Sequence, residues 1–326
     1  MEKPIISIIT PAYNASDFIE ETIASVLSQS FTSWEFIISD DGSTDDTIKK
    51  IIRASSGDSR IILNRYQHSG LPSVMRNKAL KIARGDIIAF LDADDIWEPN
   101  KLSLQIDSLS KNNKDWGFAN VTIFGGNEYQ PSGLWYPPKW KPNPPFLRSL
   151  LSKSGVPLLS VVVKTDLLRK VCAMSDIGEA FDERKEFKGV EDWDLSIRLS
   201  KISEPDYIPF PVARYRIHGR GISWQGQKTN YERAMTVINK HRSSVCPENS
   251  EENIKKYWLS KIAIDKMLDS KESWRMSLIK SCFKMPIVAR DLYLAFLSFL
   301  PTSIAKKMYI LGLKQLRKSS RLVSKN

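Results

Sequence analysis

Short apolar runs alternate with amphipathic segments along the first third of the chain. The runs are rich in β-branched residues and are bounded by Pro, Gly or Asp, which is typical of buried parallel strands. They cover residues 5–10, 35–39, 60–64 and 86–91. Between them, apolar residues at helical spacing predict three helices, which begin near Ser16, Thr44 and Pro72. This alternation predicts an α/β fold whose open, mostly parallel, Rossmann-like sheet is flanked by helices.

From residue 116 onward the pattern is less regular. Strands are predicted at residues 116–124, 158–164 and 214–218, and a helix at residues 191–199. An aromatic and proline-rich stretch lies between the first two of these strands, at residues 129–145. Its rings either offer a platform to the C–H faces of a sugar or cover the sheet as a hydrophobic loop.

Polar side chains gather where the predicted strands end, at residues 11–14, 40–41 and 92–95. Because ligands bind beyond the carboxyl ends of the strands in such sheets, these loops are expected to converge on one site. The three carboxylates within residues 92–95 repel one another unless a cation neutralises them, and Mg²⁺ or Mn²⁺ shared with substrate phosphates fits that need. The alternative is a solvated turn that caps a helix. Asp95 is expected to start the helix that follows.

Charge is distributed unevenly along the chain, whose formal net charge is +11. Residues 1–240 hold 31 Lys and Arg against 30 Asp and Glu, whereas residues 241–326 hold 17 against 7. The basic character therefore belongs to the C-terminal quarter, which argues against a uniformly basic nucleic-acid-binding domain. We expect no nucleic-acid partner.

The cysteines and the absence of targeting patterns do not indicate a functional site, but they predict where in the cell the protein is found. The three cysteines are scattered, without a CxxC or Cys/His cluster, so neither a disulfide framework nor a zinc site is predicted. No signal-peptide pattern precedes the first strand, and no uncharged apolar run reaches about 20 residues. These features predict a cytoplasmic protein without a membrane-spanning helix.

Six motifs, in this order, resemble those of the nucleotide-sugar-dependent glycosyltransferases of family 2. They are SIITPAYN (7–14), IISDDGSTDDT (37–47), MRNKALKIARGDIIAFLDADD (75–95), GEAFDER (178–184), VEDWDLSIRL (190–199) and YRIHGRGIS (215–223). The resemblance implies the fold called GT-A. It divides the chain into a nucleotide-sugar-binding part (1–115), an acceptor-binding part of the same domain (116–224) and a helical, basic C-terminal region (225–326).

The resemblance also implies roles for individual residues. Binding of the nucleotide-sugar donor falls to Pro11, Tyr13, Asn14, Asp41, Arg76, Asp92 and Ala93. Asp94 is the expected ligand of Mn²⁺ or Mg²⁺, and His218 can approach the metal or the pyrophosphate. Asp192 is the expected catalytic base, and Glu191 and Trp193 beside it are candidates for acceptor binding. Each has a plainer interpretation: Asp192 as a helix cap, His218 as an ordinary surface or core histidine, and Trp193 as packing.

Sugar transfer needs these residue types. A divalent ion held by Asp94 would neutralise the charge that develops on a leaving diphosphate, and a carboxylate such as Asp192 can take the proton of a sugar hydroxyl. One base without a carboxylate nucleophile implies single displacement with inversion. Two alternatives are a nucleotidyltransferase, which should carry a Gly-rich basic phosphate loop after the first strand, and a non-catalytic sugar- or nucleotide-binding module. The loop PAYN argues against the first, and the presence of both Asp94 and Asp192 argues against the second.

The C-terminal quarter combines an apolar run with a basic helical face. Residues 292–300 are uncharged but too few to span a bilayer, and Lys and Arg at 306–321 fall on one side of a predicted helix. This pattern predicts peripheral attachment to an anionic membrane surface, on the cytoplasmic face. The alternative is a helical cap or an oligomer interface. Membrane attachment would fit a lipid-linked saccharide acceptor in surface polysaccharide assembly.

Overall fold

The computed structural model describes residues 3–125, 133–152, 155–219, 221 and 227–245. The strands in these ranges are β1 (Ile6–Ala12), β2 (Trp34–Asp40), β3 (Ile61–Arg65), β4 (Ile87–Phe90), β5 (Ile96–Trp97), β6 (Trp116–Gly125), β7 (Gly133–Leu134), β8 (Val162–Lys164) and β9 (Asp206–Ile217). The helices are α1 (Ile19–Leu27), α2 (Thr47–Ser55), α3 (Pro72–Ile82), α4 (Lys101–Lys111), α5 (Phe146–Ser152), α6 (Thr165–Ala173), α7 (Glu191–Ser200) and α8 (Gln227–Val245). Two short 3₁₀ helices are η1 (Leu158–Ser160) and η2 (Lys185–Phe187).

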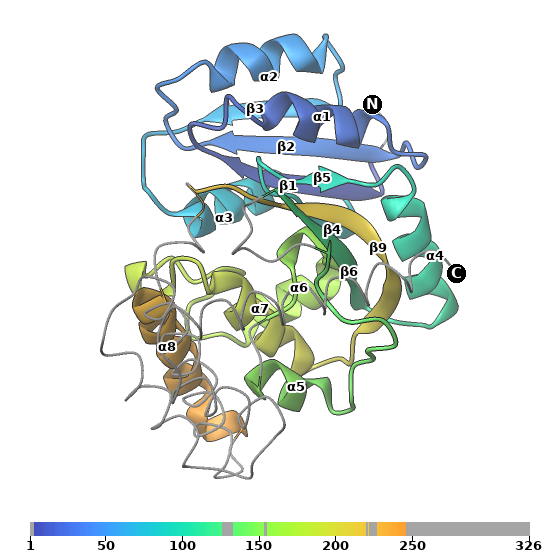
Figure 1. Ribbon diagram of the computed structural model, residues 1–326, viewed down its shortest axis with the longest axis vertical. Coiled ribbons are helices and arrows are strands. Elements are labelled where there is room, and N and C mark those ends of the chain that lie inside the picture. Colours follow the sequence, from blue (N-terminus) through green and yellow to red (C-terminus); the bar gives the residue numbers. More distant parts are fainter. Residues whose placement is uncertain (1–2, 126–132, 153–154, 220, 222–226, 246–326) are drawn as a thin grey trace, which may run out of the picture.

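The strands form one sheet in the order β3-β2-β1-β4-β8-β6-β9-β5, with β7 paired to β6 (Figure 1). Its first half is parallel, because β1 pairs with both β2 and β4, and β2 pairs with β3. Its second half is mixed: β8 runs antiparallel to β4 and β6, whereas β9 runs parallel to β6. The predicted α/β sheet with flanking helices is confirmed. Every parallel pair, β6 with β9 included, is connected through helices, as parallel neighbours require.

Helices cover both faces of the sheet, so the strands are buried on both sides. Neighbouring residues of β1 illustrate this, since Ile8 packs into a cluster with Ile19 and Ile23 of α1. Ile9 packs into the opposite cluster, which includes Leu195 of α7 and Val237 of α8. Figure 1 shows α1 and α2 beside β1–β3 at one end of the molecule, with α5, α7 and α8 gathered at the other. Continuous apolar runs, rather than alternating ones, follow from this double burial.

The prediction of one continuous strand over residues 158–164 is wrong for the first half of that range. Residues 158–164 divide into the 3₁₀ turn η1 and the short strand β8. Ser160 explains the turn, because its hydroxyl donates to the carbonyl oxygen of Pro157 at 2.8 Å and bends the chain before Val162. The turn places Leu158 and Leu159 on the pocket described below.

The aromatic stretch at 129–145 serves mainly as a cover over its described part. Tyr136 and Trp140 stack with their ring centroids 4.0 Å apart and pack on Phe118 of β6 and Tyr207 of β9. Trp135 points the other way, because it lines the pocket. The covering interpretation therefore holds for Tyr136 and Trp140, whereas a sugar platform at Trp135 stays a prediction.

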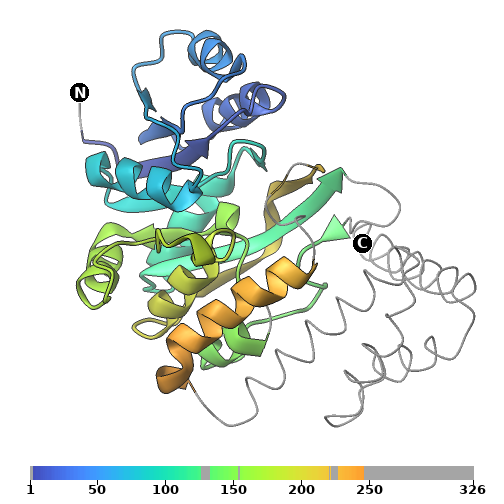
Figure 2. The same cartoon turned by 90° about the vertical axis from the view of Figure 1, so that its left-hand side faces the viewer.

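The predicted helices, apolar run and basic face beyond residue 245 lie outside the described residues. Within the part that is described, no helix is long and apolar enough to cross a membrane. Residues 227–245 of the C-terminal region form α8, which lies on the same side of the molecule as α7 (Figure 2).

Candidate active site

The carboxyl ends of β1, β2 and β4 open into one pocket of about 640 Å³. The first turn of α7 and the end of β9 complete its walls. Every residue that the sequence predicts for the site lines this pocket: Pro11, Tyr13, Asn14, Asp41, Arg76, Asp92, Ala93, Asp94, Glu191, Asp192, Trp193 and His218. Segments more than 180 residues apart in the sequence thus meet in one cavity.

The acidic loop after β4 is held from two sides. The hydroxyl of Thr22 in α1 lies 3.0 Å from the carbonyl oxygen of Ala93 and 2.9 Å from that of Asp95. On the other side, the buried carboxylate of Asp95 accepts a hydrogen bond from the backbone N–H of Arg216 at 2.8 Å. Burial raises the pKa of Asp95 well above its usual range. The expectation that Asp95 starts a helix is wrong, because α4 begins only at Lys101.

Asp94 and His218 meet in the pocket, with His218 Nε2 2.7 Å from Asp94 Oδ2. The histidine follows β9, and its ring packs against Phe18 at a centroid distance of 4.7 Å. Within the described part of the chain, the buried Nδ1 of His218 has no hydrogen-bond partner. The structure therefore brings together the two side chains that the sequence associates with a metal.

Arg76 of α3 bridges the loop after β4 and the start of α7. Its guanidinium donates to Asp92 Oδ1 at 2.6 Å and to Glu191 Oε1 at 2.8 Å. Burial alone would lower the pKa of Arg76, but the two carboxylates more than offset this, so the pKa is raised. Burial also raises the pKa of Asp92, which the guanidinium counteracts only in part. The charge of Arg76 is thus shared between two protein carboxylates.

Asp192 lies in the first turn of α7 and faces the same pocket. Its Oδ1 accepts a hydrogen bond from the backbone N–H of Trp193 at 2.7 Å. Burial, reinforced by the charge of Glu191, raises the pKa of Asp192 to about 7. A carboxylate with this pKa can both accept and release a proton near neutral pH. We call Arg76, Asp92, Glu191 and Asp192 the pocket cluster.

The two neighbours of Asp192 are built into the protein. Trp193 is buried, and its indole N–H donates to the carbonyl oxygen of Leu150 at 2.9 Å. Glu191 is also buried, and it binds Arg76 and the backbone N–H of Gly189. Because these polar atoms are occupied by the protein, the geometry favours support of the pocket wall over direct contact with an acceptor.

At the opposite end of the pocket, Asp41 fixes the loop that follows β3. Its carboxylate accepts hydrogen bonds from the backbone N–H of Ser69 at 2.7 Å, from the Ser69 hydroxyl at 2.9 Å and from the backbone N–H of Gly70 at 2.8 Å. His68 Nδ1 lies 2.9 Å from the carbonyl oxygen of Asp41. The expected contact of Asp41 with a nucleotide base stays a prediction.

His68 is a pocket residue that sequence reasoning missed. Its ring stacks on Tyr13 with a centroid distance of 4.2 Å and an interplanar angle of 26°. Together the two rings form an aromatic wall where the predicted nucleotide site lies. The available signal was position, since His68 follows the third strand just as Tyr13 follows the first.

Asn14 joins the loops after β1 and β2. Its backbone adopts a positive φ of 46°, a conformation that asparagine tolerates better than most residues. The side-chain oxygen accepts a hydrogen bond from the backbone N–H of Thr44 at 2.9 Å, and the Asn14 backbone N–H donates to the Ser43 hydroxyl at 2.9 Å. The side chain of Asn14 therefore shapes the pocket rim.

The far wall contains further side chains that the sequence analysis did not single out. Trp135 and Tyr215 pack edge to face, with centroids 5.5 Å apart, and both line the pocket. Arg216 donates from Nε to the carbonyl oxygen of Asp94 at 2.8 Å and pairs with Glu21. No spacing in the sequence predicts these contacts, because β9 reaches the acidic loop through its pairing with β5, a strand far away in the sequence.

Asp94 and His218 can hold a divalent cation only as part of a shared shell. Among the residues that the structure describes, no group of three or more His, Cys, Asp or Glu side chains forms a complete metal site. Mg²⁺ and related ions are commonly bound by one or two carboxylates plus substrate phosphates. One carboxylate and an imidazole with an unpartnered buried nitrogen fit such an arrangement.

Comparison with known proteins agrees with the fold and with the sequence motifs. The family model of glycosyl transferase family 2 matches residues 7–160. The chain is 36% identical over 168 residues to WfgD of Escherichia coli, named UDP-Glc:alpha-D-GlcNAc-diphosphoundecaprenol beta-1,3-glucosyltransferase. That match covers 52% of this chain and 63% of WfgD. The chain spans between 47% and 63% of the length of the first three curated relatives.

Solved structures share the fold at lower identity. S. aureus TarS 1-349 in complex with UDP-GlcNAc superimposes with a TM-score of 0.62 at 18% identity, over 97% of this chain and 91% of that one. The mannosyltransferase PcManGT from Pyrobaculum calidifontis, in complex with GDP-Man and Mn²⁺, gives a TM-score of 0.55 at 17% identity, over 96% and 87%. The predicted GT-A fold is confirmed. Residues 7–160 of this chain belong to glycosyl transferase family 2.

Proposed function

We propose that this protein is a metal-dependent, inverting glycosyltransferase that moves a sugar from a nucleoside-diphosphate sugar to a hydroxyl group of a saccharide. The observation that carries the proposal is Asp192, a carboxylate with a pKa raised to about 7 that faces the same pocket as the strand-end loops. Family membership of residues 7–160 and the nucleotide-sugar complexes of proteins with this fold support it.

The donor would bind along the carboxyl ends of β1, β2 and β4. Tyr13 and His68 offer stacked rings to the base, and Asp92, which lines the same pocket, would contact the ribose. Asp94 and His218 would hold the divalent cation, which would supply Lewis-acid neutralisation of the charge on the departing diphosphate. The protein itself fixes these groups, because Thr22, Arg76 and Arg216 all bind the loop after β4.

Asp192 would act from the acceptor side as general base. The acceptor hydroxyl gives its proton to the Asp192 carboxylate while its oxygen bonds to the anomeric carbon of the donor. The bond between that carbon and the diphosphate oxygen breaks, and the nucleoside diphosphate leaves with the electron pair. One displacement without a carboxylate nucleophile inverts the configuration at the anomeric carbon.

The acceptor we propose is a lipid-linked saccharide of a surface polysaccharide pathway. The printed name of the relative WfgD describes an acceptor of this chemistry, a GlcNAc-diphosphoundecaprenol. Trp135 and Tyr215 provide aromatic surface in the pocket on which a sugar ring could pack.

A panel of nucleotide sugars tests the proposal most directly. Purified full-length protein with Mn²⁺ or Mg²⁺ should release nucleoside diphosphate from a subset of UDP- and GDP-sugars, and release should rise when a lipid-linked saccharide acceptor is added. Loss of release on chelation, and its return with added Mn²⁺, would show the metal requirement. Absence of release with every donor and acceptor would refute a transferase.

We also infer that the basic segment beyond residue 285 attaches the protein to anionic membrane, on the cytoplasmic face. The support is the sequence pattern alone, a net charge of +10 over residues 241–326 beside a short apolar run. Co-sedimentation with liposomes containing anionic lipid should be lost when residues 286–326 are removed. Equal binding by both forms would refute attachment through this segment.

A further inference from the structure

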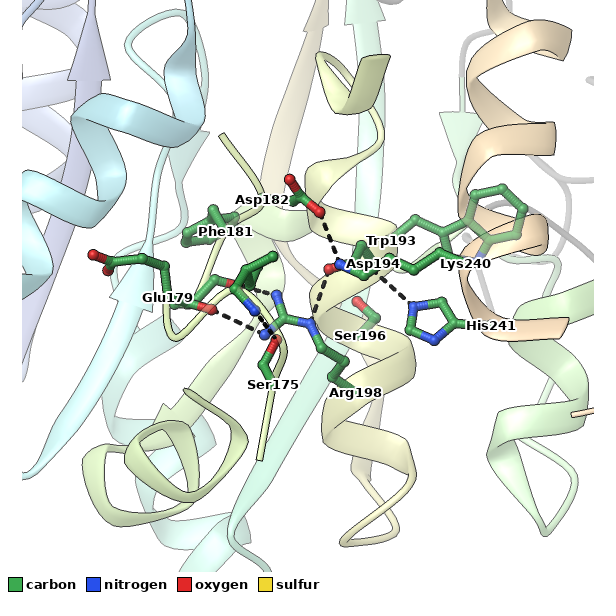
Figure 3. A network of polar contacts seen from close by, with 12 residues as sticks. Ser175, Glu179, Phe181, Asp182, Trp193, Asp194, Ser196, Arg198, Lys240 and His241 are labelled. Atoms are coloured by element: carbon green, nitrogen blue, oxygen red, sulfur yellow. Dashed lines mark hydrogen bonds and ion pairs between the residues drawn. The ribbon is translucent and has the colours of Figure 1, made fainter. Parts of the chain in front are cut away.

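A second buried polar cluster lies on the side of α7 that faces away from the pocket. We call Asp182, Asp194, Arg198, Lys240 and His241 the Asp194 cluster (Figure 3). Asp194 is fully buried. Residues two positions apart in an α-helix point in directions about 200° apart around the helix axis. Asp192 can therefore face the pocket while Asp194, in the same turn, faces α8.

Cations surround the Asp194 carboxylate from two helices. Arg198 donates from Nε to Oδ2 at 2.9 Å, and Lys240 Nζ lies 3.0 Å from Oδ1. His241 Nε2 lies 2.8 Å from the same oxygen. Although burial acts in the opposite direction, these partners lower the pKa of Asp194 below its usual range. The carboxylate is thus ionised and fully paired inside the protein.

The proton position on His241 follows from its two neighbours. Its Nδ1 lies 2.9 Å from the ammonium group of Lys201, which can only donate. Nδ1 must therefore be the acceptor, and Nε2 must carry the proton that is donated to Asp194. Burial lowers the pKa of His241, in agreement with this neutral tautomer.

Lys240 extends the cluster to the wall that carries Arg76. Its ammonium group also lies 2.8 Å from Asp182 Oδ2, in the loop that precedes η2. That loop is tied to α3, because Asn77 donates to the carbonyl oxygen of Phe181 at 2.8 Å and accepts from the Phe181 N–H at 3.0 Å. Asn77 is adjacent to Arg76. One lysine of α8 therefore contacts both α7 and the loop bound to α3, and these two helices carry most of the pocket cluster.

Apolar packing holds α8 in this place. Ala234, Val237 and Ile238 are buried in the same core cluster as Trp193 and Phe187. The contact surface and the polar cluster therefore belong to one interface between α7 and α8. Helix α8 lies beyond residues 7–160, the segment matched by the family model.

We propose that Lys240 and His241 are positioning residues for sugar transfer: through Asp194 they hold the first turn of α7 so that Asp192 stays aimed at the acceptor. The inference rests on the proposed function, in which Asp192 is the general base. In this arrangement the family domain depends on a helix outside it for the placement of its base. Displacement of a base by about 1 Å can cost a hundredfold in rate.

The test compares Lys240→Met with Lys240→Arg in the full chain. Lys240→Met should lower kcat about ten- to a hundredfold and leave the donor KM within about twofold, because the donor site lies on other elements. It should also move the acid limb of the kcat/KM profile upward by roughly half a pH unit, because the charge of Asp194, two positions from Asp192, is then compensated less completely and disfavours the ionised form of Asp192. Lys240→Arg keeps the charge and should leave the acid limb in place.

Two further variants keep the test decisive. Asn239→Ala, at an exposed neighbour on α8, is the matched control and should match the wild type. If Lys240→Met does not fold by circular dichroism, Lys240→Gln takes its place, because it removes the charge while keeping an N–H donor for Asp194 and Asp182. It should fold and show a smaller fall in kcat with the same shift of the acid limb. Folded variants with kcat within twofold of the wild type and an unmoved acid limb would overturn the inference.

The failure of this inference can be told apart from failure of the proposed function. Asp192→Asn is assayed in parallel. If Asp192→Asn keeps full turnover, the assignment of the base is wrong and the positioning role falls with it. If Asp192→Asn is inactive while the Lys240 variants behave as the wild type, only the positioning role is overturned.

Discussion

The pocket cluster and the Asp194 cluster lie on opposite sides of one helical turn, and the balance of positive and negative charge differs between them. In the pocket cluster, three carboxylates surround the guanidinium of Arg76, and the pKa of Asp192 is raised to about 7 by burial. In the Asp194 cluster, cations from α7 and α8 surround one carboxylate, and the pKa of Asp194 is lowered. Two aspartates two positions apart thus have opposite electrostatic environments.

The difference indicates that the pocket cluster is suited to bind a ligand, whereas the charges of the Asp194 cluster are already paired within the protein. A buried carboxylate is costly unless it is paired, so excess negative charge persists where function requires it. The Asp194 cluster has its partners within the protein and stabilises the interface of α7 and α8. The pocket cluster leaves Asp192 able to exchange a proton and leaves room for a cation at the neighbouring Asp94.

The largest expected effect is on turnover. Asp192→Asn removes the proposed base while keeping the size of the side chain, and kcat/KM should fall by about 10² to 10⁴. Binding of the nucleoside diphosphate, measured by calorimetry, should stay within about twofold. A variant that keeps wild-type turnover would contradict the role of Asp192.

The next largest effect is on stability, and it tests the other side of the turn. Asp194→Ala leaves Arg198 and Lys240 buried without their carboxylate, which should cost about 3–5 kcal/mol in denaturant unfolding. The matched control is Asp166→Ala on α6, whose carboxylate is 84% exposed and pairs with Arg169 at 3.3 Å. It should cost at most about 1 kcal/mol. Equal losses for both variants would contradict a structural role for the Asp194 cluster.

A smaller effect concerns the metal. Asp94→Asn removes the carboxylate proposed as its ligand, and the affinity for Mn²⁺ in the presence of nucleoside diphosphate should weaken at least about tenfold. Calorimetric titration measures this directly. Asp86→Asn, at an exposed carboxylate before β4, is the control and should bind Mn²⁺ as the wild type does. Unchanged affinity in Asp94→Asn would place the metal elsewhere.

The smallest expected effect is on the pH dependence of activity, which tests whether the pKa of Asp192 is raised. Only the ionised form of Asp192 can accept a proton, and its pKa in the free protein is raised to about 7. Activity should therefore be full above pH 7 and fall about tenfold per pH unit below it, as read from kcat/KM. An acid limb near pH 4, the usual range of a carboxyl group, would show that Asp192 is not the group that limits the rate.

Much of the fold and the site could be predicted because the signals are local. Continuous β-branched runs such as residues 5–10 and 35–39 specify strands buried on both faces. Residues at the ends of parallel strands must meet at one edge, so Tyr13, Asp41 and Asp94 were predicted together and line one pocket. The split of residues 158–164 escaped prediction, because local hydrogen bonds of Ser160 and Val161 turn the chain there and leave no trace in the apolar pattern.

By itself, the sequence determined which carboxylates lie at the strand ends and which family motifs accompany them. Local spacing left Asp192 and Asp194 alike, as two acids at a helix start, and only the family resemblance singled out Asp192 as the expected base. The tertiary structure distinguished their ionisation, because the partners of Asp194 include Lys240 and His241, more than 40 residues further along the chain. Ionisation depends on burial and on which charges packing brings within hydrogen-bond distance, and neither is encoded in local spacing.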